Sequence, residues 1–321
     1  MSATQWTEPV PAVDRDRYGR PLVTPPGGGK ATPYTRCTTF VGCLEDTYNL
    51  SRWQQRMVAL GLSERPDLML AVTATDRSDK QALGGICDSA MEAAKAHAAA
   101  TTGTALHALT ERVDRGQEVG IVPDAYVADL AAYATATTDL RHELIEQFCV
   151  LDPLKVGGTP DRVVKYQGTR YIADLKTGSI AYGIGKIAMQ LAVYARSQVY
   201  DISTGERSMH DADLTRGIII HLPAGTGECT LHWVDLVQGW YGVQMARAVR
   251  DWRKLKLGDL TETFGAAATE PPTLAQQVSA CTTAQAVRDL WATHASEWTD
   301  ALTQTAKEHI GSLGTNGSNA A

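Results

Sequence analysis

Apolar residues recur at helical spacing through the first 140 residues of the chain. Gly103 is expected to separate two of the predicted helices, and Pro123 suits the first turn of another. Before them, residues 1–33 are rich in proline and glycine, which predicts an extended, partly mobile arm. The predicted helices cover residues 36–62, 80–100, 103–115 and 123–138.

Short β-prone runs then replace the helical pattern, with turn signals such as Gln167-Gly168 between them. Strands are predicted over residues 144–151, 156–165, 169–175, 216–222 and 229–235, and helices over 185–200 and 236–255. This succession predicts an α/β core over residues 34–260. Residues 261–321 are predicted to form a helical appendage, with a disordered tail from Gly314.

Composition adds few constraints beyond an ordinary globular protein. The 321 residues are 44% hydrophobic and 21% charged, and the sequence has no apolar run of membrane-spanning length and no secretory signal at its beginning. We therefore expect a cytoplasmic protein with no membrane association. The net charge of −6 counts mildly against a protein that coats DNA, but less against a nuclease, which needs only a local positive groove.

The six cysteines are scattered and include no C-x-x-C pair. This spacing argues against a zinc ribbon and against a disulfide framework.

The strongest chemical signal is a pair of aspartates in the predicted strands. Asp161 and Asp174 belong to runs joined by the turn Gln167-Gly168, and a hairpin of this length can bring them side by side. Two carboxylates held this close repel each other unless a cation lies between them. Oxygen ligands of this kind favour Mg²⁺, Mn²⁺ or Ca²⁺ over zinc.

Two further residues fit the same site. Lys176 lies two positions beyond Asp174 and therefore on the same strand face, where an ammonium group can stabilise charge on a phosphate. His107 lies on a predicted helix, four residues after Gly103, and could complete the coordination of a metal. His107 alone would be interpreted as a structural or surface histidine, and only the downstream aspartates favour the metal.

Four other side chains are weaker candidates. Glu111 shares a helix face with His107, and Glu146 precedes the aspartates, where it could orient a ligand or a water; a solvated strand position explains Glu146 equally well. Gln190 and Tyr194 share a face of the next helix, and both can donate hydrogen bonds to a phosphate or a base edge.

Four segments of the chain together resemble the RecB-like branch of the PD-(D/E)XK nuclease superfamily. They are Gly103–Glu111, Gly158–Asp161, Asp174–Gly178 and Gln190–Tyr194, which follow that branch's order of a Gly-x-x-x-His helix, a Gly-x-x-Asp strand, an Asp-x-Lys strand and a Gln-x-x-x-Tyr helix. The resemblance covers about residues 100–235. Residues 34–53 and the overall size also look like the stand-alone exonucleases of actinobacterial phages.

The resemblance implies a restriction-endonuclease-like fold, with a mixed central sheet flanked by helices and extra helices before it. It implies Mg²⁺ or Mn²⁺ held by His107, Asp161, Asp174 and the Leu175 carbonyl, with Lys176 as the catalytic lysine and Gln190 and Tyr194 shaping the DNA side. Related CRISPR-associated enzymes often carry an iron–sulfur cluster on four cysteines. Only Cys229 and Cys281 follow the four motif segments here, so no cluster is expected.

The implied activity is a metal-dependent DNA exonuclease acting in phage recombination, repair or replication, in the host cytoplasm if a phage encodes it. A structure- or site-specific endonuclease has the same site chemistry, and a non-catalytic DNA-binding recombination partner is the third alternative. The helices after Thr273 could dock a single-strand annealing protein or simply cover the core.

Two basic segments are candidate DNA contacts. Arg247, Arg250, Arg253 and Lys254 lie along one predicted helix, although a solvated helix end explains them equally well. Trp53, which has arginines nearby, could stack on a base, but a position in the core is the favoured interpretation.

Overall fold

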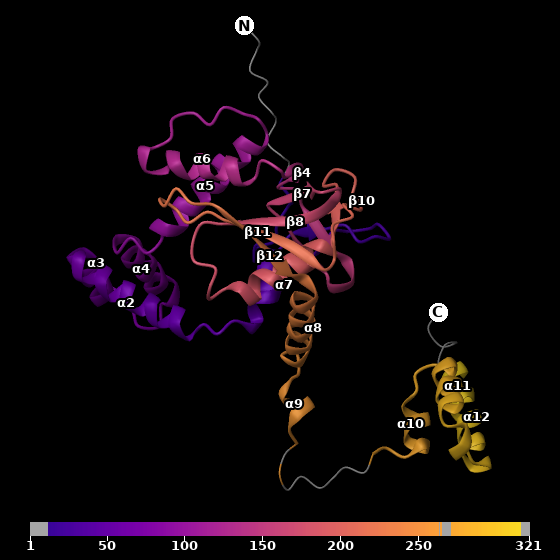
Figure 1. The fold of residues 1–321 in the computed structure, drawn as a ribbon. Coiled ribbons are helices and arrows are strands. Elements are labelled where there is room, and N and C mark those ends of the chain that lie inside the picture. The colour runs from indigo at the N-terminus through magenta and orange to yellow at the C-terminus, as the bar shows by residue number, and fades with distance from the viewer. Residues whose placement is uncertain (1–11, 263, 265–270, 316–321) are drawn as a thin grey trace. The chain divides into compact units, whose positions relative to one another are not determined.

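The computed structural model describes residues 12–262, 264 and 271–315. Its strands form two mixed sheets of five strands and one of two strands, accompanied by helices, so the protein is mixed α/β (Figure 1). The chain divides into two compact units, Met1–Lys254 and Leu255–Ala321. The sheets belong to the first unit.

The first five-stranded sheet has the strand order β10-β9-β5-β6-β3. Its neighbours are antiparallel except for β3 and β6, which run parallel. The strands are β3 (Thr35–Arg36), β5 (Cys149–Leu151), β6 (Val156–Gly158), β9 (Gln198–Tyr200) and β10 (Arg207–Ser208). β1 (Leu22–Val23) and β2 (Thr32–Pro33) pair with each other.

The second sheet has the order β12-β11-β8-β7-β4, and only β8 and β11 are parallel neighbours. The prediction of one mixed central sheet is therefore wrong, because the strands are divided between two five-stranded sheets. The strands are β4 (Arg141–Ile145), β7 (Arg162–Tyr166), β8 (Thr169–Lys176), β11 (Arg216–His221) and β12 (Thr230–Asp235).

Hydrophobic clusters cover both faces of the second sheet. Alternate residues such as Ile172 and Ile219 pack in one cluster with α7 (Ile184–Ala195) and α8 (Leu236–Trp252). Their neighbours Ala173 and Ile218 pack in another cluster with Tyr133 of α6 (Asp124–Ala136). Because β8 is apolar on both faces, Asp174 is held in a largely dry environment.

The helices before the sheets differ from the predicted ones in their boundaries. Gly103 does not interrupt a helix: α5 (Ala98–Asp114) runs through it, and the break falls at residues 94–97, where Lys95 has φ +56°. The other helices are α1 (Cys37–Val41), α2 (Tyr48–Glu64), α3 (Pro66–Ala74), which was not predicted, and α4 (Lys80–Ala93), with a short 3₁₀ turn at Gly42–Leu44.

Three predicted elements after residue 140 are each split in the structure. The strand predicted over 156–165 forms β6 and β7, which lie in different sheets. The strand predicted over 144–151 forms β4 and β5, which lie in different sheets, and the chain turns between them at Glu146, where φ is +52°. The helix predicted over 185–200 ends at Ala195, and the chain continues as β9. The predicted arm is also packed where it is described, because Val23 is fully buried beside Phe148 and Tyr200.

The second unit is helical and has its own small core, formed by residues such as Val278, Val287 and Ala306. Its helices are α9 (Leu257–Leu260), α10 (Leu274–Ala280), α11 (Ala284–Thr293) and α12 (Asp300–Thr315). The tail predicted to be disordered lies outside the described residues from position 316 onward.

Candidate active site

The β7–β8 hairpin brings the two predicted aspartates together. Gln167 and Gly168 have φ angles of +48° and +87°, as a tight turn with two left-handed residues requires, and Tyr166 pairs with Thr169 across it. The register continues to Arg162 opposite Ala173, which places Asp161 beside Asp174. The Leu175 amide donates a 2.8 Å hydrogen bond to Asp161 Oδ2. The geometry predicted for this pair is confirmed.

Asp174 and Lys176 lie on the same face of β8, as their spacing predicts. Asp174 is 2% exposed, and its Oδ2 atom forms an ion pair with Lys176 Nζ. No hydrogen bond of normal geometry reaches this buried oxygen. Burial and the neighbouring Asp161 carboxylate raise the pKa of Asp174 to about 6, although the Lys176 ammonium opposes the shift.

His107 reaches this pair from α5, far away in the sequence. Its Nδ1 atom lies 3.4 Å from Asp161 Oδ2. Burial lowers the pKa of His107, and the Lys176 ammonium lowers it further, while Asp174 and the Leu175 main chain act in the opposite direction. The imidazole is therefore favoured in its neutral form, which is the form that can bind a metal.

Gly103 explains why α5 can lie so close to the end of β8. A Cβ atom at this position would lie 2.9 Å from Thr177 Oγ1, a distance that side chains almost never adopt. Gly103 and His107 are four residues apart and so share one face of α5. The absent side chain at Gly103 lets that face, and His107 with it, approach the carboxyl end of β8.

Two more carboxylates belong to the same cluster. The Glu146 amide donates a 3.0 Å hydrogen bond to the Asp161 carbonyl, which fixes Glu146 next to the hairpin. Burial, together with the charges of Asp161 and Glu111, raises the pKa of Glu146 to about 8. Glu111 is also 3.9 Å from Arg115. The structure thus brings Glu111 and Glu146 to the site where the sequence offered them as candidates.

A buried charge network under the site was missed in the sequence analysis. The side chain of Arg162, directly after Asp161, is fully buried, and its Nε donates to Asp114 Oδ2 at the end of α5. Arg162 Nη2 also donates to Thr110 Oγ1 at 2.9 Å, and the Tyr133 hydroxyl donates to Asp114 at 2.8 Å. This network joins α5 to β7 one residue away from Asp161. It therefore fixes the position of His107 relative to Asp161.

Gln190 and Tyr194 lie beside the site on α7, but at different depths. Tyr194 is 3% exposed and hydrogen-bonded to Gln190, and burial raises its pKa. A Cβ atom at Gly158 would lie 2.7 Å from the Tyr194 hydroxyl. Tyr194 therefore packs beneath the Gly158 backbone, and Gln190, which is half-buried, lies nearer the surface.

The donor atoms do not form a closed metal cage in this structure. Among residues 12–262, 264 and 271–315, no three His, Cys, Asp or Glu side chains converge closely enough to hold one ion. Asp161 Oδ2 accepts the Leu175 amide, and Asp174 Oδ2 faces Lys176. All six cysteines are free.

The candidate DNA contacts lie outside this cluster. Trp53 is half-buried on α2 and is absent from the hydrophobic clusters formed by the described residues, so its predicted place in the core is wrong. The cationic side chains at the end of α8 make specific contacts: Arg250 lies over the Phe40 ring, and Arg253 Nη2 donates to the Cys43 carbonyl at 3.4 Å.

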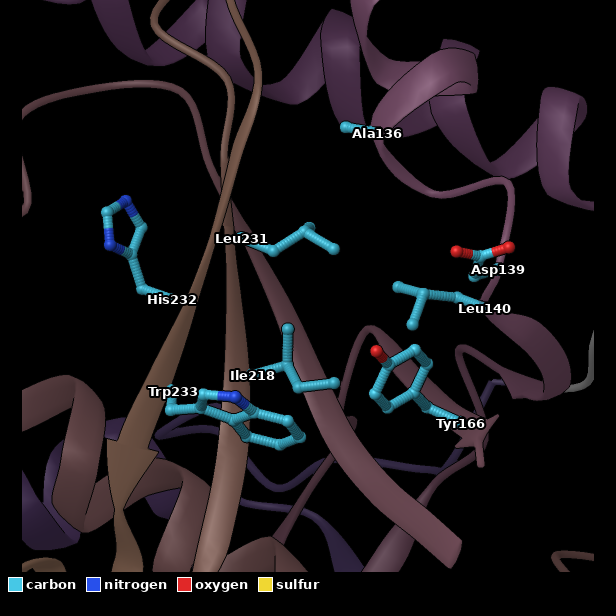
Figure 2. A pocket seen from close by; sticks show the side chains of 8 residues that line it. All are labelled: Ala136, Asp139, Leu140, Tyr166, Ile218, Leu231, His232 and Trp233. Atoms are coloured by element: carbon cyan, nitrogen blue, oxygen red, sulfur yellow. The ribbon is translucent and has the colours of Figure 1, made fainter. Parts of the chain in front are cut away.

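An apolar pocket of about 180 Å³ lies on the other face of the second sheet (Figure 2). Its lining includes Tyr166, Ile218 and Trp233, and Ile218 pairs with Ala173, whose side chain points away from the face that carries Asp174. Trp233 also packs edge-on against Tyr171 at 4.9 Å. This pocket is therefore separate from the carboxylate cluster.

Comparison with models of known protein families finds no match, and no curated protein matches the chain. Among the described residues, the helices lack the combination of length and apolar character that crossing a bilayer requires.

Proposed function

We propose that this chain is a Mg²⁺- or Mn²⁺-dependent deoxyribonuclease. One observation carries the proposal: the end of β8, the residue before β7 and the middle of α5 bring together Asp174 and Lys176, Asp161 and His107. Carboxylates, an imidazole and an ammonium group in one partly open cluster suit metal-assisted phosphodiester hydrolysis.

The donor set is compatible with a hard divalent cation. Asp174 Oδ2 is buried against Lys176 Nζ, and two buried carboxylates side by side are costly unless enough positive charge lies near them. Asp161, Asp174, His107 and the Leu175 carbonyl would hold the ion. When bound, such an ion polarises the phosphate and lowers the pKa of a coordinated water.

Side chains of the protein would stabilise the transition state, orient the attacking water and bind the DNA. The Lys176 side chain is 30% exposed, so its ammonium can reach a phosphate oxygen and stabilise negative charge in the transition state. Glu146 would orient the attacking water from its position beside Asp161. Tyr194 would hold Gln190 in place, and Gln190 would donate to the DNA.

The order of the motifs supports a finer proposal. A restriction-endonuclease-like core of the PD-(D/E)XK type, with an exonuclease activity in phage DNA recombination, repair or replication, agrees with the hairpin, the α5 histidine and the α7 Gln-x-x-x-Tyr pair. Linear and circular substrates distinguish this activity from that of an endonuclease.

The proposal is tested by cleavage of DNA with defined ends. The purified chain is incubated with Mg²⁺, Mn²⁺ or a chelator and with end-labelled linear DNA, single- and double-stranded, or closed circles. We expect metal-dependent loss of linear DNA and no cleavage of closed circles. Cleavage of the circles would instead identify an endonuclease.

A matched pair of lysine variants makes the test specific to the site. Lys176→Met should reduce the rate by about 100- to 1,000-fold, as does removal of one group that stabilises transition-state charge. Lys165→Met, on β7 of the same hairpin, should cleave at the wild-type rate. Wild-type protein that binds DNA without cleaving any substrate would refute the nuclease proposal and leave a non-catalytic DNA-binding protein.

A further inference from the structure

A second feature of the first unit is a cationic pocket away from the carboxylate cluster. It has a volume of about 370 Å³ and lies between the residues that precede β6 and the carboxyl end of α8. We call it the α8 pocket, and its lining includes Phe40, Lys155, Arg247, Arg250, Asp251 and Lys254.

The charge of the α8 pocket is strongly positive in a chain whose net charge is −6. Four cationic side chains face a single carboxylate, that of Asp251. Asp251 is shared, because Lys254 Nζ lies 2.6 Å and Arg247 Nε 3.9 Å from its oxygens. Lys155 has no ion-pair partner within the described part of the chain. The pocket therefore retains a surplus of positive charge for an anionic ligand.

Arg250 is held in position while its hydrogen-bonding capacity is largely unused. Its guanidinium lies 5.1 Å from the centre of the Phe40 ring, in cation–π geometry. Its contacts with the Thr39 carbonyl and with Thr35 Oγ1 are both 3.5 Å long. A guanidinium has five N–H donors in a planar fork that matches phosphate oxygens.

The chain connects this pocket directly to the candidate active site. Lys155 precedes β6, and Asp161 follows β6 by three residues. Six residues of extended chain span at most about 20 Å. Consecutive phosphates of one DNA strand advance by about 3.4 Å along the helix axis, so the α8 pocket lies within roughly six nucleotides of the cluster.

We propose that the α8 pocket binds backbone phosphates of the substrate strand a few nucleotides from the bond that is cut. The proposal rests on the proposed nuclease function for its ligand. Binding there depends on charge and not on base sequence, so the pocket would anchor any DNA strand while the carboxylate cluster acts on it.

The test measures how salt weakens DNA binding. The full chain binds fluorescein-labelled 20-nucleotide DNA in a chelator, so that no cleavage occurs, and fluorescence anisotropy gives the affinity over a range of KCl concentrations. Lys155→Gln/Arg247→Gln removes two pocket charges and leaves Arg250 on Phe40. Arg141→Gln/Lys165→Gln, two paired residues of β4 and β7, is the charge-matched control.

Each lost phosphate contact flattens the plot of log affinity against log salt by about 0.7 for a single strand and about 0.9 for a duplex. The pocket variant should therefore lose about 1.4 to 1.8 of slope. If affinity at 1 M salt is unchanged, binding at 0.1 M salt falls by roughly 25- to 60-fold. The control should keep the wild-type slope.

Three results would overturn the proposal. A pocket variant with the wild-type slope, in a wild-type chain that cleaves DNA, would refute the pocket and leave the nuclease function intact. A wild-type chain that neither binds nor cleaves DNA would refute both. The third result comes from thermal unfolding in inorganic phosphate and in chloride at equal ionic strength. If phosphate stabilises the wild-type chain but not the pocket variant, and the two chains bind DNA equally well, the pocket is a site for a small anion and not for DNA.

Discussion

Glu146 is predicted to destabilise the folded protein at neutral pH, and its replacement by glutamine should make the protein more stable. Its carboxyl group is partly buried near Asp161 and Glu111, and its pKa rises from 4.5 to about 8. Between these two pH values the folded state binds a proton that the unfolded state has released. Stability therefore falls as the pH rises from 4.5 to about 8 and stays at the lower level above it.

The loss of stability can be worked out from the difference between the pKa of Glu146 in the folded and in the unfolded state. Each unit of pKa difference corresponds to about 1.4 kcal/mol, so a fully desolvated carboxyl would destabilise the fold by roughly 5 kcal/mol. Glu146 is only half-buried and solvent screens its charge, so we expect roughly 1–3 kcal/mol. Glu146→Gln keeps the shape of the side chain and removes the charge, and it should recover that free energy at pH 8.

The assay is urea unfolding of the full chain at pH 5, 7 and 9 in a chelating buffer. The gain in unfolding free energy for Glu146→Gln should be small at pH 5, larger at pH 7 and largest at pH 9. Glu143→Gln is the matched control on β4, because the Glu143 carboxylate is paired with Arg170, which lowers its pKa. This control should not stabilise the protein. A Glu146→Gln variant no more stable than wild type at pH 9, or one with a gain independent of pH, would refute the reasoning.

Three shorter predictions address the packing and the metal. Gly158→Ala should destabilise the protein by about 1–3 kcal/mol, seen as a lower Tm, because its Cβ atom would meet the Tyr194 hydroxyl at 2.7 Å; an unchanged Tm would contradict this contact. Asp114→Asn should cost about 3–5 kcal/mol in urea unfolding, because it removes the ion-pair partner of the buried Arg162 guanidinium; a loss under 1 kcal/mol would contradict the network. Mg²⁺ at 100 times its Kd should stabilise wild type by about 2.7 kcal/mol and Asp174→Asn much less; equal stabilisation of the two would place the ion elsewhere.

The hairpin that carries the site could be predicted because its geometry is local. Gln167-Gly168 specifies a tight turn, and the alternation of side chains along β8 then sets the positions of Asp174 and Lys176. Asp161 follows from the same register. These three residues needed no information about the rest of the fold.

The buried network could not be predicted, because it depends on pairs distant in the sequence. In the sequence, Arg162 has the pattern of a polar residue in a strand. No neighbouring residue in the sequence indicates that Asp114, 48 positions earlier, lies beside it in the core. The division of residues 144–151 between two sheets depends on Glu146 adopting φ +52°, a conformation that a glutamate adopts rarely. Local propensity favours a continuous strand there.

The motif glycines show why a motif with its spacing predicts the site better than its histidine or aspartate does alone. Gly103 lies against Thr177, next to Lys176, and Gly158 lies over the Tyr194 hydroxyl, three residues before Asp161. In each case a side chain would push apart the elements that bring the charged groups together. The glycines of the Gly-x-x-x-His and Gly-x-x-Asp motifs are therefore needed for close packing, and the histidine and aspartate are the candidate metal ligands. A histidine or an aspartate without its glycine would keep its chemistry but lose the close approach that places it within reach of its partners.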